Sequence, residues 1–362
     1  MRPYILYGWH LSYFTGKVLC YLRYKKVPFE FRQVDMYTLL RRIKRETGAA
    51  AMPAVLTPER QWIGDSSVII DALEQRFPGH SVVPETPVQR FASYLMEAWG
   101  DEWWVPIAMH TRWTYPENYP LFEREAGAAL LPHMPAFAQR IAAARVARTL
   151  RGMLHKVGVR PAQFKAIDAW TVQMLDHLER HFTQQPYLFG ARPSMGDFGL
   201  VGTMYGHLGR DPWPARELIA PRPNLRAWIL RMANPPPPGA LLAGDAIAPT
   251  LEPVFRAIFA EFLPLLEGIN AQVKAALPAL KPGHALRRAL GDVSLTLAGG
   301  EYRRAALPYS LWMAQRTLDV FHALAPPGQA QVRAWAAPLG GERFLQLAVP
   351  RLRISGVRVI PQ

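Results

Sequence analysis

Cysteine is nearly absent from this chain, which has one, Cys20, among 362 residues. A single thiol excludes an internal disulfide framework and a cysteine-rich zinc site. Long hydrophobic runs are also missing: no window of about 18 uncharged apolar residues could span a bilayer. Residues 1–15 hold no apolar stretch long enough for a signal peptide. We therefore expect a soluble, cytoplasmic protein with no membrane span and no metal cofactor.

Acidic residues are scarce relative to basic ones, and the net charge is +14 with a pI of about 10.1. The basic residues are spread along the chain, with one cluster in residues 41–45 and a looser one in residues 343–358. A nucleic-acid-binding protein would concentrate them on one helix or interleave them with exposed aromatics. We expect no nucleic-acid partner, whereas a positive field favours an anionic small molecule.

Apolar and aromatic side chains are abundant. Half of the residues are hydrophobic, and the chain has 11 Trp, 13 Tyr and 16 Phe. This composition is typical of a packed globular protein rather than a disordered one. A chain of this length can form two domains, each with its own core.

The first 80 residues alternate between strand and helix signals. Apolar alternation and helical periodicity predict the order strand, helix, strand, helix, strand, strand, helix. The expected ranges are 4–7, 16–26, 29–34, 37–47, 54–57 and 61–63, with a last helix that follows Gly64-Asp65-Ser66 and reaches Phe77. This order is thioredoxin-like, and we assign residues 1–80 to such an α/β domain.

Helical periodicity dominates the rest of the chain. A linker near residues 78–87 precedes apolar residues at helical spacing, which predict an all-helical domain over residues 86–235. Ser194 and Asp197 form a capping box at the start of one of its helices. Prolines at 235–238 mark a second linker, and residues 240–362 form a mainly helical extension packed on the helical domain. The expected fold class is therefore α+β, with an N-terminal thioredoxin-like domain followed by an all-α C-terminal domain and extension.

The stretch from Met52 to Phe77 combines two features of a ligand site. Met52-Pro53 precedes a short strand, where proline removes a ladder donor and a cis bond would be a deliberate feature. Asp65-Ser66 opens a helix, where side-chain acceptors cap the chain and backbone N–H groups attract an anion. Together they predict a site that holds a peptide-like ligand by its backbone and its charged end.

These residues resemble the glutathione-binding half of the glutathione S-transferase superfamily. In that family a cis-proline follows the backbone that pairs with the cysteine of glutathione, and Met52-Pro53 matches it. An acid–Ser pair at the next helix holds the γ-glutamyl group, and Asp65-Ser66 matches that pair. The resemblance implies glutathione as cosubstrate and a homodimer. The family member that this chain resembles is a bacterial-type protein of the Ser/Cys branches with a long C-terminal extension.

The same resemblance extends to the loop before the first helix. Ser12, with Lys17 five residues later, looks like the active-site segment of branches that use Ser or Cys, which makes Ser12 the catalytic hydroxyl. Tyr13 stands where that segment often has proline, and a shift of one residue would make Tyr13 the donor instead. Tyr7 and Thr15 are further alternatives. The hydroxyl would donate to the glutathione sulfur and favour the thiolate, which attacks an electrophilic small molecule.

The segment 97–113 is expected to form the wall of the pocket for the hydrophobic electrophile. Trp103, Trp104, His110 and Trp113 would give an aromatic cleft with a few polar groups. The alternative is that these aromatic residues belong to the core. For the whole protein, the alternative to an enzyme is a non-catalytic binding or scaffold protein with the same fold.

Three other patterns receive structural interpretations. Cys20 lies inside the first helix beside Leu19 and is expected to be a buried small hydrophobe. His177 and His181 have metal-ligand spacing, but no third ligand is near them in sequence, so we expect surface histidines. Asp101 and Glu102 are adjacent on a helix and point about 100° apart, so a solvated or helix-packing role is expected.

Overall fold

A computed structural model describes residues 2–362 of the chain, which form two compact units. Unit 1 contains the residues up to Ser81 together with Ala108–Leu154 and Val201–Pro236, and unit 2 contains Val82–Ile107, His155–Leu200 and Pro237–Gln362. Each unit thus combines segments that are distant in sequence. The domain boundaries inferred from the sequence stay a prediction, although two unit boundaries fall at its two proline-containing linkers.

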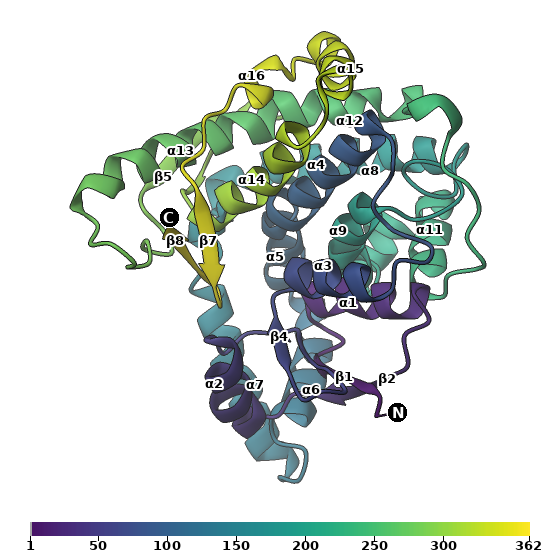
Figure 1. The fold of residues 1–362 in the computed structure, drawn as a ribbon. Coiled ribbons are helices and arrows are strands. Elements are labelled where there is room, and N and C mark those ends of the chain that lie inside the picture. The colour runs from purple at the N-terminus through teal and green to yellow at the C-terminus, as the bar shows by residue number, and fades with distance from the viewer. Residues whose placement is uncertain (1) are drawn as a thin grey trace. The chain divides into compact units, whose positions relative to one another are not determined.

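Unit 1 begins with a four-stranded mixed sheet in the order β2-β1-β3-β4 (Figure 1). Strands β1 and β2 are parallel, whereas β3 is antiparallel to both β1 and β4. The elements of this segment are β1 (Tyr4–Gly8), α1 (Tyr13–Tyr24), β2 (Phe29–Gln33), η1 (Thr38–Ile43), α2 (Lys44–Thr47), β3 (Ala54–Leu56), β4 (Trp62–Gly64) and α3 (Ser66–Arg76). The predicted thioredoxin-like order is confirmed. The helix expected over residues 37–47 is a π-helical segment followed by one α-helical turn.

Both faces of the sheet are covered. Leu6 and Val55 are fully buried, and helices α1 and α3 contact each other and strands β1 and β3. Because side chains alternate along a strand, Tyr7 and Ala54 point to the opposite face. There they join an apolar cluster with residues of α6 and α7. The Tyr7 ring stacks on the Trp62 ring, with the two ring centroids 5.0 Å apart.

Unit 1 contains further helical elements besides those of the sheet segment. They are η2 (Pro116–Asn118), α6 (Tyr119–Leu130), α7 (Ala136–Arg151), η5 (Met204–Leu208), α10 (Pro212–Pro214), η6 (Ala215–Ile219) and α11 (Pro223–Ala233). Helices α6 and α7 form an antiparallel pair next to α2 (Figure 1). Three elements run across a unit boundary, namely α5 (Val105–Thr114), η3 (Leu154–Val157) and α9 (Met195–Thr203).

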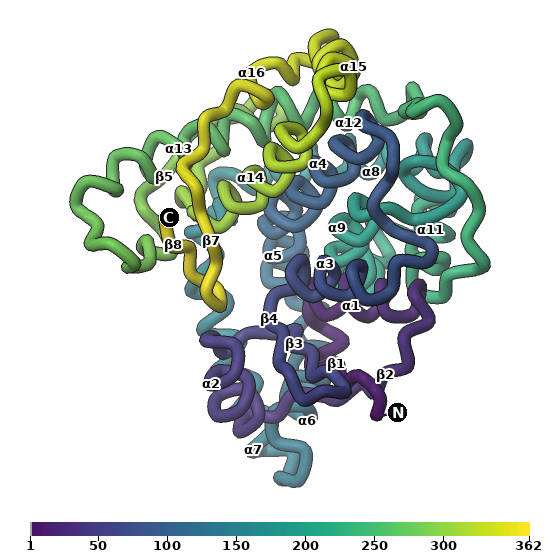
Figure 2. Tube along the Cα trace, viewed as in Figure 1, coloured from purple at the N-terminus to yellow at the C-terminus, as the bar shows by residue number. Residues whose placement is uncertain are grey.

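Unit 2 is mainly helical, and its chain can be followed to the carboxyl end in Figure 2. Its helices are α4 (Pro87–Trp103), η4 (Pro161–Gln163), α8 (Phe164–Phe182), η7 (Ala243–Asp245), η8 (Pro249–Leu251), α12 (Glu252–Ala257), η9 (Ile258–Phe262), α13 (Leu263–Ala276), η10 (Leu277–Ala279), α14 (Pro308–His322), α15 (Pro326–Ala336), η11 (Ala337–Leu339) and α16 (Glu342–Leu345). Two antiparallel hairpins complete it, β5 (Asp292–Leu297) with β6 (Gly300–Ala305) and β7 (Leu352–Ser355) with β8 (Arg358–Pro361). No helix within residues 2–362 is long and apolar enough to cross a membrane.

The carboxyl-terminal extension packs on α4 through buried polar contacts. Helix α14 lies along α4, where Arg316 of α14 pairs with the buried Glu97 at 3.1 Å. Glu102 accepts a hydrogen bond from the Ser310 hydroxyl. A buried carboxylate needs such partners, because charge is costly to remove from water. Asp101 and Glu102 are both buried, so the helix-packing interpretation is confirmed and the solvated one is wrong.

The capping box predicted at the start of α9 is present, and a close helix contact follows it. The Asp197 carboxylate accepts hydrogen bonds from the Ser194 backbone N–H at 2.8 Å and from the Leu188 N–H at 3.1 Å. This is the reach-back expected of a capping box. Gly199 lies against α4, where an added Cβ would be 2.6 Å from the Glu97 Cα. Only glycine permits this approach of the two backbones.

Candidate functional site

Three chain segments meet at one end of the unit 1 sheet. Tyr7 of β1 pairs with Ala54 of β3, and Ala54 pairs in turn with Gly64 of β4. Neighbouring strands lie about 5 Å apart. The loop after β1, the peptide bond before Ala54 and the turn after Gly64 therefore emerge side by side. This convergence brings the candidate residues of all three segments to one edge of the sheet.

Met52 and Pro53 form the middle part of this edge. The Met52-Pro53 peptide bond is cis, as the sequence led us to expect. Pro53 is buried, Met52 is half-buried, and β3 begins at the next residue. The backbone just before β3 thus lies between the other two segments.

Asp65 and Ser66 form the part that follows β4. Asp65 is the N-cap of α3, and its carboxylate accepts hydrogen bonds from the backbone N–H groups of Ser67 at 3.0 Å and Val68 at 3.2 Å. Its backbone has φ 72° and ψ 129°, a conformation that residues other than glycine rarely adopt. Ser66 is the first residue of α3 and is buried. The predicted helix start is confirmed, and the helix presents its positive end at the sheet edge.

Ser12 lies at the third part, in the loop after β1. It is the N-cap of α1, and its half-buried hydroxyl oxygen accepts a hydrogen bond from the Thr15 N–H at 3.3 Å. A hydroxyl that accepts in this way still has its own proton to donate. Its backbone N–H donates to the Trp9 carbonyl at 3.0 Å. Ser12 therefore combines the positive end of a helix with a hydroxyl donor.

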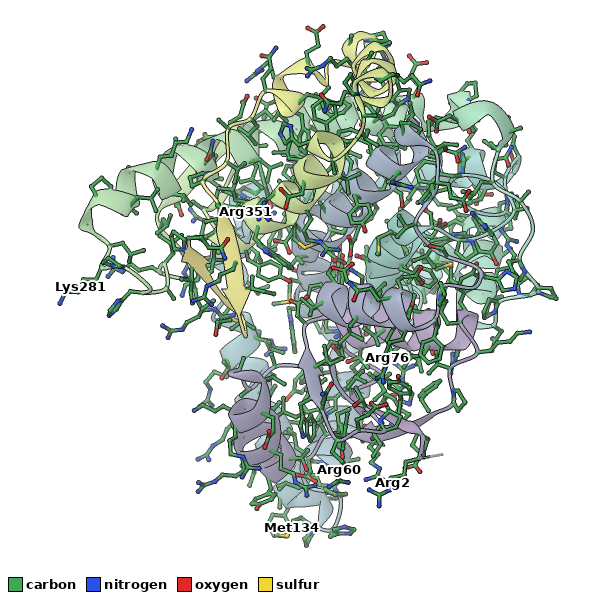
Figure 3. The ribbon with its side chains drawn as sticks, in the orientation of Figure 1. Arg2, Arg60, Arg76, Met134, Lys281 and Arg351 are labelled. Atoms are coloured by element: carbon green, nitrogen blue, oxygen red, sulfur yellow. The ribbon has the colours of Figure 1, made fainter. Side chains whose placement is uncertain are left out.

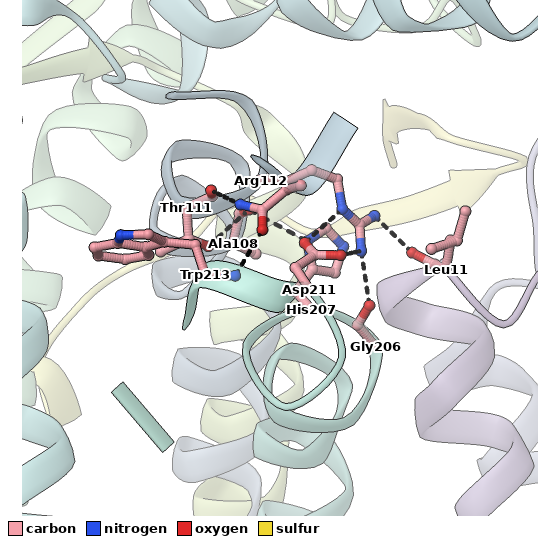
Figure 4. Close-up of polar contacts among 9 residues, drawn as sticks. Leu11, Ala108, Thr111, Arg112, Gly206, His207, Asp211 and Trp213 are labelled. Carbon is pink, nitrogen blue, oxygen red and sulfur yellow. Dashed lines mark hydrogen bonds and ion pairs between the residues drawn. The ribbon is translucent and has the colours of Figure 1, made fainter. Parts of the chain in front are cut away.

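An arginine of α5 holds the Ser12 loop in place (Figure 4). Arg112 is buried, and its Nη1 donates to the Leu11 carbonyl at 2.8 Å. Its Nε and Nη2 bind both carboxylate oxygens of Asp211 at 2.8 and 3.0 Å. Nη2 also donates to the Gly206 carbonyl at 2.8 Å. Every guanidinium nitrogen thus has a partner, and one of the partners is the residue before Ser12.

Gly206 adds a second constraint on this loop. A Cβ at Gly206 would lie 3.1 Å from the Ser12 carbonyl oxygen, so glycine lets η5 approach the backbone of the loop. His207, the next residue, donates from Nδ1 to the Ala108 carbonyl at 3.2 Å. Burial and the neighbouring Arg112 charge lower the pKa of His207 well below its ordinary value. A neutral imidazole therefore lies beside the buried ion pair.

Sequence reasoning missed Arg112 and Asp211. They are 99 positions apart, and no local pattern links them. In the sequence, the one signal is that Arg112 interrupts a mainly apolar segment. In the structure, its neighbours Thr111 and Trp113 are buried. Burial raises the pKa of Asp211, and the Arg112 charge opposes that rise.

Two family models match the chain. Residues 6–81 match the N-terminal domain of glutathione S-transferases, and residues 162–231 match the C-terminal domain. The chain carries both domains of the glutathione S-transferase superfamily. The first match covers the thioredoxin-like sheet described above except for Tyr4 and Ile5 of β1.

Solved structures with a related chain trace include several transferases. The β-etherase LigF from a Sphingobium species is 22% identical, with 65% of this chain and 96% of that chain covered and a TM-score of 0.45. A glutathione S-transferase from Methylobacterium radiotolerans, in complex with glutathione sulfonate, is 20% identical over 68% of this chain and 100% of that chain, with a TM-score of 0.40. No curated protein matches the sequence. The family assignment therefore rests on the two domain matches.

Tyr13 and Lys17, which follow Ser12 in the sequence, are both buried against other elements of unit 1. The Tyr13 ring is buried, lies edge-on to His207 at 5.9 Å and packs where an added Cβ of Gly202 would be 2.8 Å away. Lys17 is fully buried, and its Nζ donates to the Ser67 hydroxyl at 3.0 Å. Lys17 thus links α1 to the first turn of α3. The assignment of the catalytic hydroxyl stays a prediction.

The four residues expected to line the pocket for the electrophile are all buried. In unit 2, Trp103 and Trp104 pack against Trp170, with ring centroids 6.2 and 5.1 Å away. In unit 1, the His110 Nδ1 lies 2.9 Å from the Thr114 hydroxyl, and Trp113 belongs to the apolar cluster below the sheet. These positions agree with the alternative that the aromatics are core residues. Contact of the four with a substrate stays a prediction.

The two remaining side-chain patterns have different outcomes. Cys20 is fully buried, and burial raises the pKa of its thiol to about 12, as expected of a structural cysteine. The surface prediction is wrong for His181, which is fully buried between the Thr250 hydroxyl at 2.8 Å and the Tyr187 carbonyl at 3.2 Å. Burial lowers its pKa to about 4. The partner Thr250 is 69 positions away, so the sequence around His181 gave no sign of it.

Proposed function

We propose that this protein binds glutathione at the edge of the unit 1 sheet and transfers its thiolate to an electrophilic small molecule. The observation that carries the proposal is the pairing of Tyr7, Ala54 and Gly64 in one row across three strands. That row brings the Ser12 loop, the Met52-Pro53 bond and Asp65-Ser66 to one place. The two family matches support a transferase in general.

Ser12 is the proposed thiol-activating group. Its hydroxyl donates to the glutathione sulfur, while its oxygen keeps the hydrogen bond from the Thr15 N–H. A free thiol has a pKa of about 8.5, which a helix N-terminus and a hydrogen-bond donor lower. The thiolate then attacks the electrophile and forms a carbon–sulfur bond, and the leaving group departs with the electron pair. The nucleophile belongs to glutathione, so no protein residue is alkylated.

Asp65 and Ser66 are the proposed anchors of the γ-glutamyl end. The Asp65 carboxylate attracts the ammonium group of that residue, and the positive end of α3 at Ser66 attracts its carboxylate. The backbone at Met52-Pro53 is proposed to pair with the cysteine of glutathione. The unusual backbone conformation of Asp65 supports this role, since strained residues concentrate at ligand sites.

Two substitutions at Ser12 separate catalysis from helix capping. Ser12→Ala removes both the cap acceptor and the hydroxyl donor, whereas Ser12→Asp keeps a good cap acceptor and places a negative charge beside the sulfur. We expect glutathione to bind both variants, and turnover with a panel of electrophiles to fall by about 100-fold or more in each. The pKa of the bound thiol, followed by thiolate absorbance, should rise. Full turnover in Ser12→Asp would show that Ser12 is only a cap.

Asp65→Asn tests the binding site without removing the cap. An asparagine can still accept hydrogen bonds from Ser67 and Val68, so α3 should keep its start. Calorimetric titration should give a glutathione affinity about tenfold to hundredfold weaker, because a hydrogen bond to a charged group is lost. Unchanged affinity would place the γ-glutamyl group elsewhere.

The same measurements address the non-catalytic alternative. Glutathione binding with no turnover on any electrophile would make the protein a ligand-binding or scaffold member of the family. Homodimer formation and a cytoplasmic location also stay predictions, and light scattering of the purified chain checks the first of them.

A further inference from the structure

Exposed apolar side chains are concentrated on one surface of unit 1. Within residues 2–362, eight large apolar side chains are exposed, and six of them come from two short segments. The six are Met36, Tyr37, Leu40, Met134, Phe137 and Ile141, which we call the apolar patch. Tyr37 and Phe137 have 69% and 68% of their surface exposed. A cluster of this kind is unusual on a soluble surface and marks a place of interaction.

The two segments form one continuous surface. A groove of about 500 Å³ is lined from one side by Met36, Tyr37 and Leu40 and from the other by residues 130–134 of the turn between α6 and α7. Figure 3 shows Met134 at the tip of that turn. Phe137 and Ile141 continue from it at helical spacing along α7. The patch is therefore a single face and not a set of scattered residues.

Helix α7 exposes Phe137 and Ile141, whereas its Val146 and Leu150 are half-buried against the core cluster of unit 1. Its buried residues are three alanines, Ala142, Ala143 and Ala147, whereas Phe137 and Ile141 are exposed. An ordinary surface helix would direct its large apolar residues into the core. Neither Phe137 nor Ile141 belongs to the core of unit 1, so both side chains are available to a partner outside this unit.

Positive charge predominates on the two segments of the patch, with Asp35 and Glu46 at the two ends of the first segment. Residues 36–45 and 126–151 contain eight Arg or Lys residues and no Asp or Glu. Arg41, Arg42, Lys44, Arg140 and Arg145 are exposed, and none of them forms an ion pair within residues 2–362. The one carboxylate that lines the groove, Asp35, binds the Thr38 N–H and hydroxyl. The partner must therefore offer apolar burial and negative charge.

We infer that this surface docks on a lipid bilayer that carries anionic headgroups. Protruding aromatic and aliphatic side chains insert at the level of the headgroups, and the surrounding Arg and Lys side chains bind their phosphates. A second copy of the chain does not fit, since self-pairing would place two sets of unpaired cations against each other. The proposal is independent of the proposed transferase activity.

Vesicle sedimentation of the full-length chain tests the inference. We expect it to sediment with vesicles of mixed phosphatidylglycerol and phosphatidylcholine, and much less with phosphatidylcholine alone. Binding should weaken as salt is raised, because screening reduces the attraction. Absence from both kinds of vesicle would overturn the inference.

Apolar insertion is tested with matched variants. Tyr37→Gln and Phe137→Gln should each weaken vesicle binding by about tenfold or more, since each removes a side chain that is buried on docking. Leu230→Gln is the control, because Leu230 is also exposed, at 57%, but lies on α11 outside the patch. Equal binding by Phe137→Gln and Leu230→Gln would overturn the inference.

Charge is tested in the same way. The double variant Arg41→Glu with Lys44→Glu should lose about 25-fold or more on anionic vesicles, at about fivefold for each cation removed. Its control, Arg287→Glu with Arg288→Glu, makes the same change of net charge at exposed residues of unit 2. Polyglutamate binding that depends on Phe137, without vesicle binding, would identify an acidic protein partner instead. A change of oligomeric state in Phe137→Gln by light scattering would identify a second copy of the chain.

Discussion

Arg112 of unit 1 and Arg304 of unit 2 are both buried, and their hydrogen bonding differs. Arg112 of unit 1 forms a bidentate pair with Asp211, and its other donors bind the Leu11 and Gly206 carbonyls. Arg304 of unit 2 is equally buried, but it makes one hydrogen bond, from Nη1 to the Glu102 carbonyl at 3.1 Å. Its Nε has no partner within residues 2–362. The fully paired arginine is the one beside the candidate site.

One carboxyl group in each unit repeats this contrast. Asp211 of unit 1 faces the Arg112 guanidinium, whereas the half-buried Glu261 of unit 2 has one neutral partner, the Trp170 N–H at 2.5 Å. Desolvation therefore raises the pKa of Glu261 to about 7, against which the Trp170 hydrogen bond acts weakly. The comparison shows that a buried ion pair holds a loop of unit 1 at Arg112, whereas Arg304 and Glu261 of unit 2 have few polar partners.

Arg112→Met should have the largest effect. It leaves the Asp211 carboxylate buried without a cation, and breaking a buried pair in this way costs about 3–5 kcal/mol of unfolding free energy. Equilibrium unfolding in urea measures it. Glutathione affinity should fall as well, because the Leu11 carbonyl before Ser12 loses its donor. A loss no larger than that of Arg304→Met would break the comparison.

A double variant separates charge from loop positioning. Arg112→Met with Asp211→Leu removes both charges, and a buried pair replaced by apolar residues is often near neutral for stability. We expect unfolding free energy to return to within about 2 kcal/mol of the parent. Glutathione affinity should stay reduced, since nothing now holds the Leu11 carbonyl. Recovery of both properties would show that Arg112 does not position the loop.

Glu261→Gln should stabilise unit 2 at alkaline pH. The folded pKa of Glu261, about 7, lies above its ordinary value of 4.5. The unfolded chain therefore loses this proton first, and the parent loses stability as pH rises from about 4.5 to about 7. Glutamine cannot ionise and still accepts from Trp170, so the gain at pH 8 should be about 1–2 kcal/mol. Thermal unfolding at pH 5 and pH 8 measures it, and an equal gain at both pH values would contradict the pKa.

Arg304→Met should have the smallest effect. The substitution removes one hydrogen bond and an unpaired buried donor, and methionine fills part of the space. We expect a loss of about 1 kcal/mol or less in urea unfolding. Arg112→Met is the matched substitution in unit 1. A loss of several kcal/mol here would mean that Arg304 has a partner role like that of Arg112.

The unit 1 elements were predicted from sequence with errors of a few residues. Strand β1 begins at the predicted Tyr4, and α1 begins three residues earlier than expected, at Tyr13. Their signals are local, because alternation and helix caps depend on neighbours in the chain. Asp65 was placed correctly for the same reason. The failures, His181 and the missed Arg112, concern side chains whose partners lie 69 and 99 positions away.

The sequence also does not determine which face of α7 is exposed. Periodicity shows that Phe137 and Ile141 share a helix face with a stripe of basic residues. It does not show whether that face meets a sheet, a partner or solvent. The alanine face of α7, with the half-buried Val146 and Leu150, joins the apolar cluster of unit 1 instead, and the patch is left open.

The sequence by itself determined the order of strands and helices, the Pro53 position and the helix start at Asp65. Each depends on residues within a few positions, where backbone geometry and side-chain chemistry act directly. Only the tertiary structure decided that Arg112 holds the Ser12 loop, that Trp103 and Trp104 are core residues, and that Phe137 faces outward. Those outcomes depend on which distant surfaces compete for burial, and burial is a property of the packed chain.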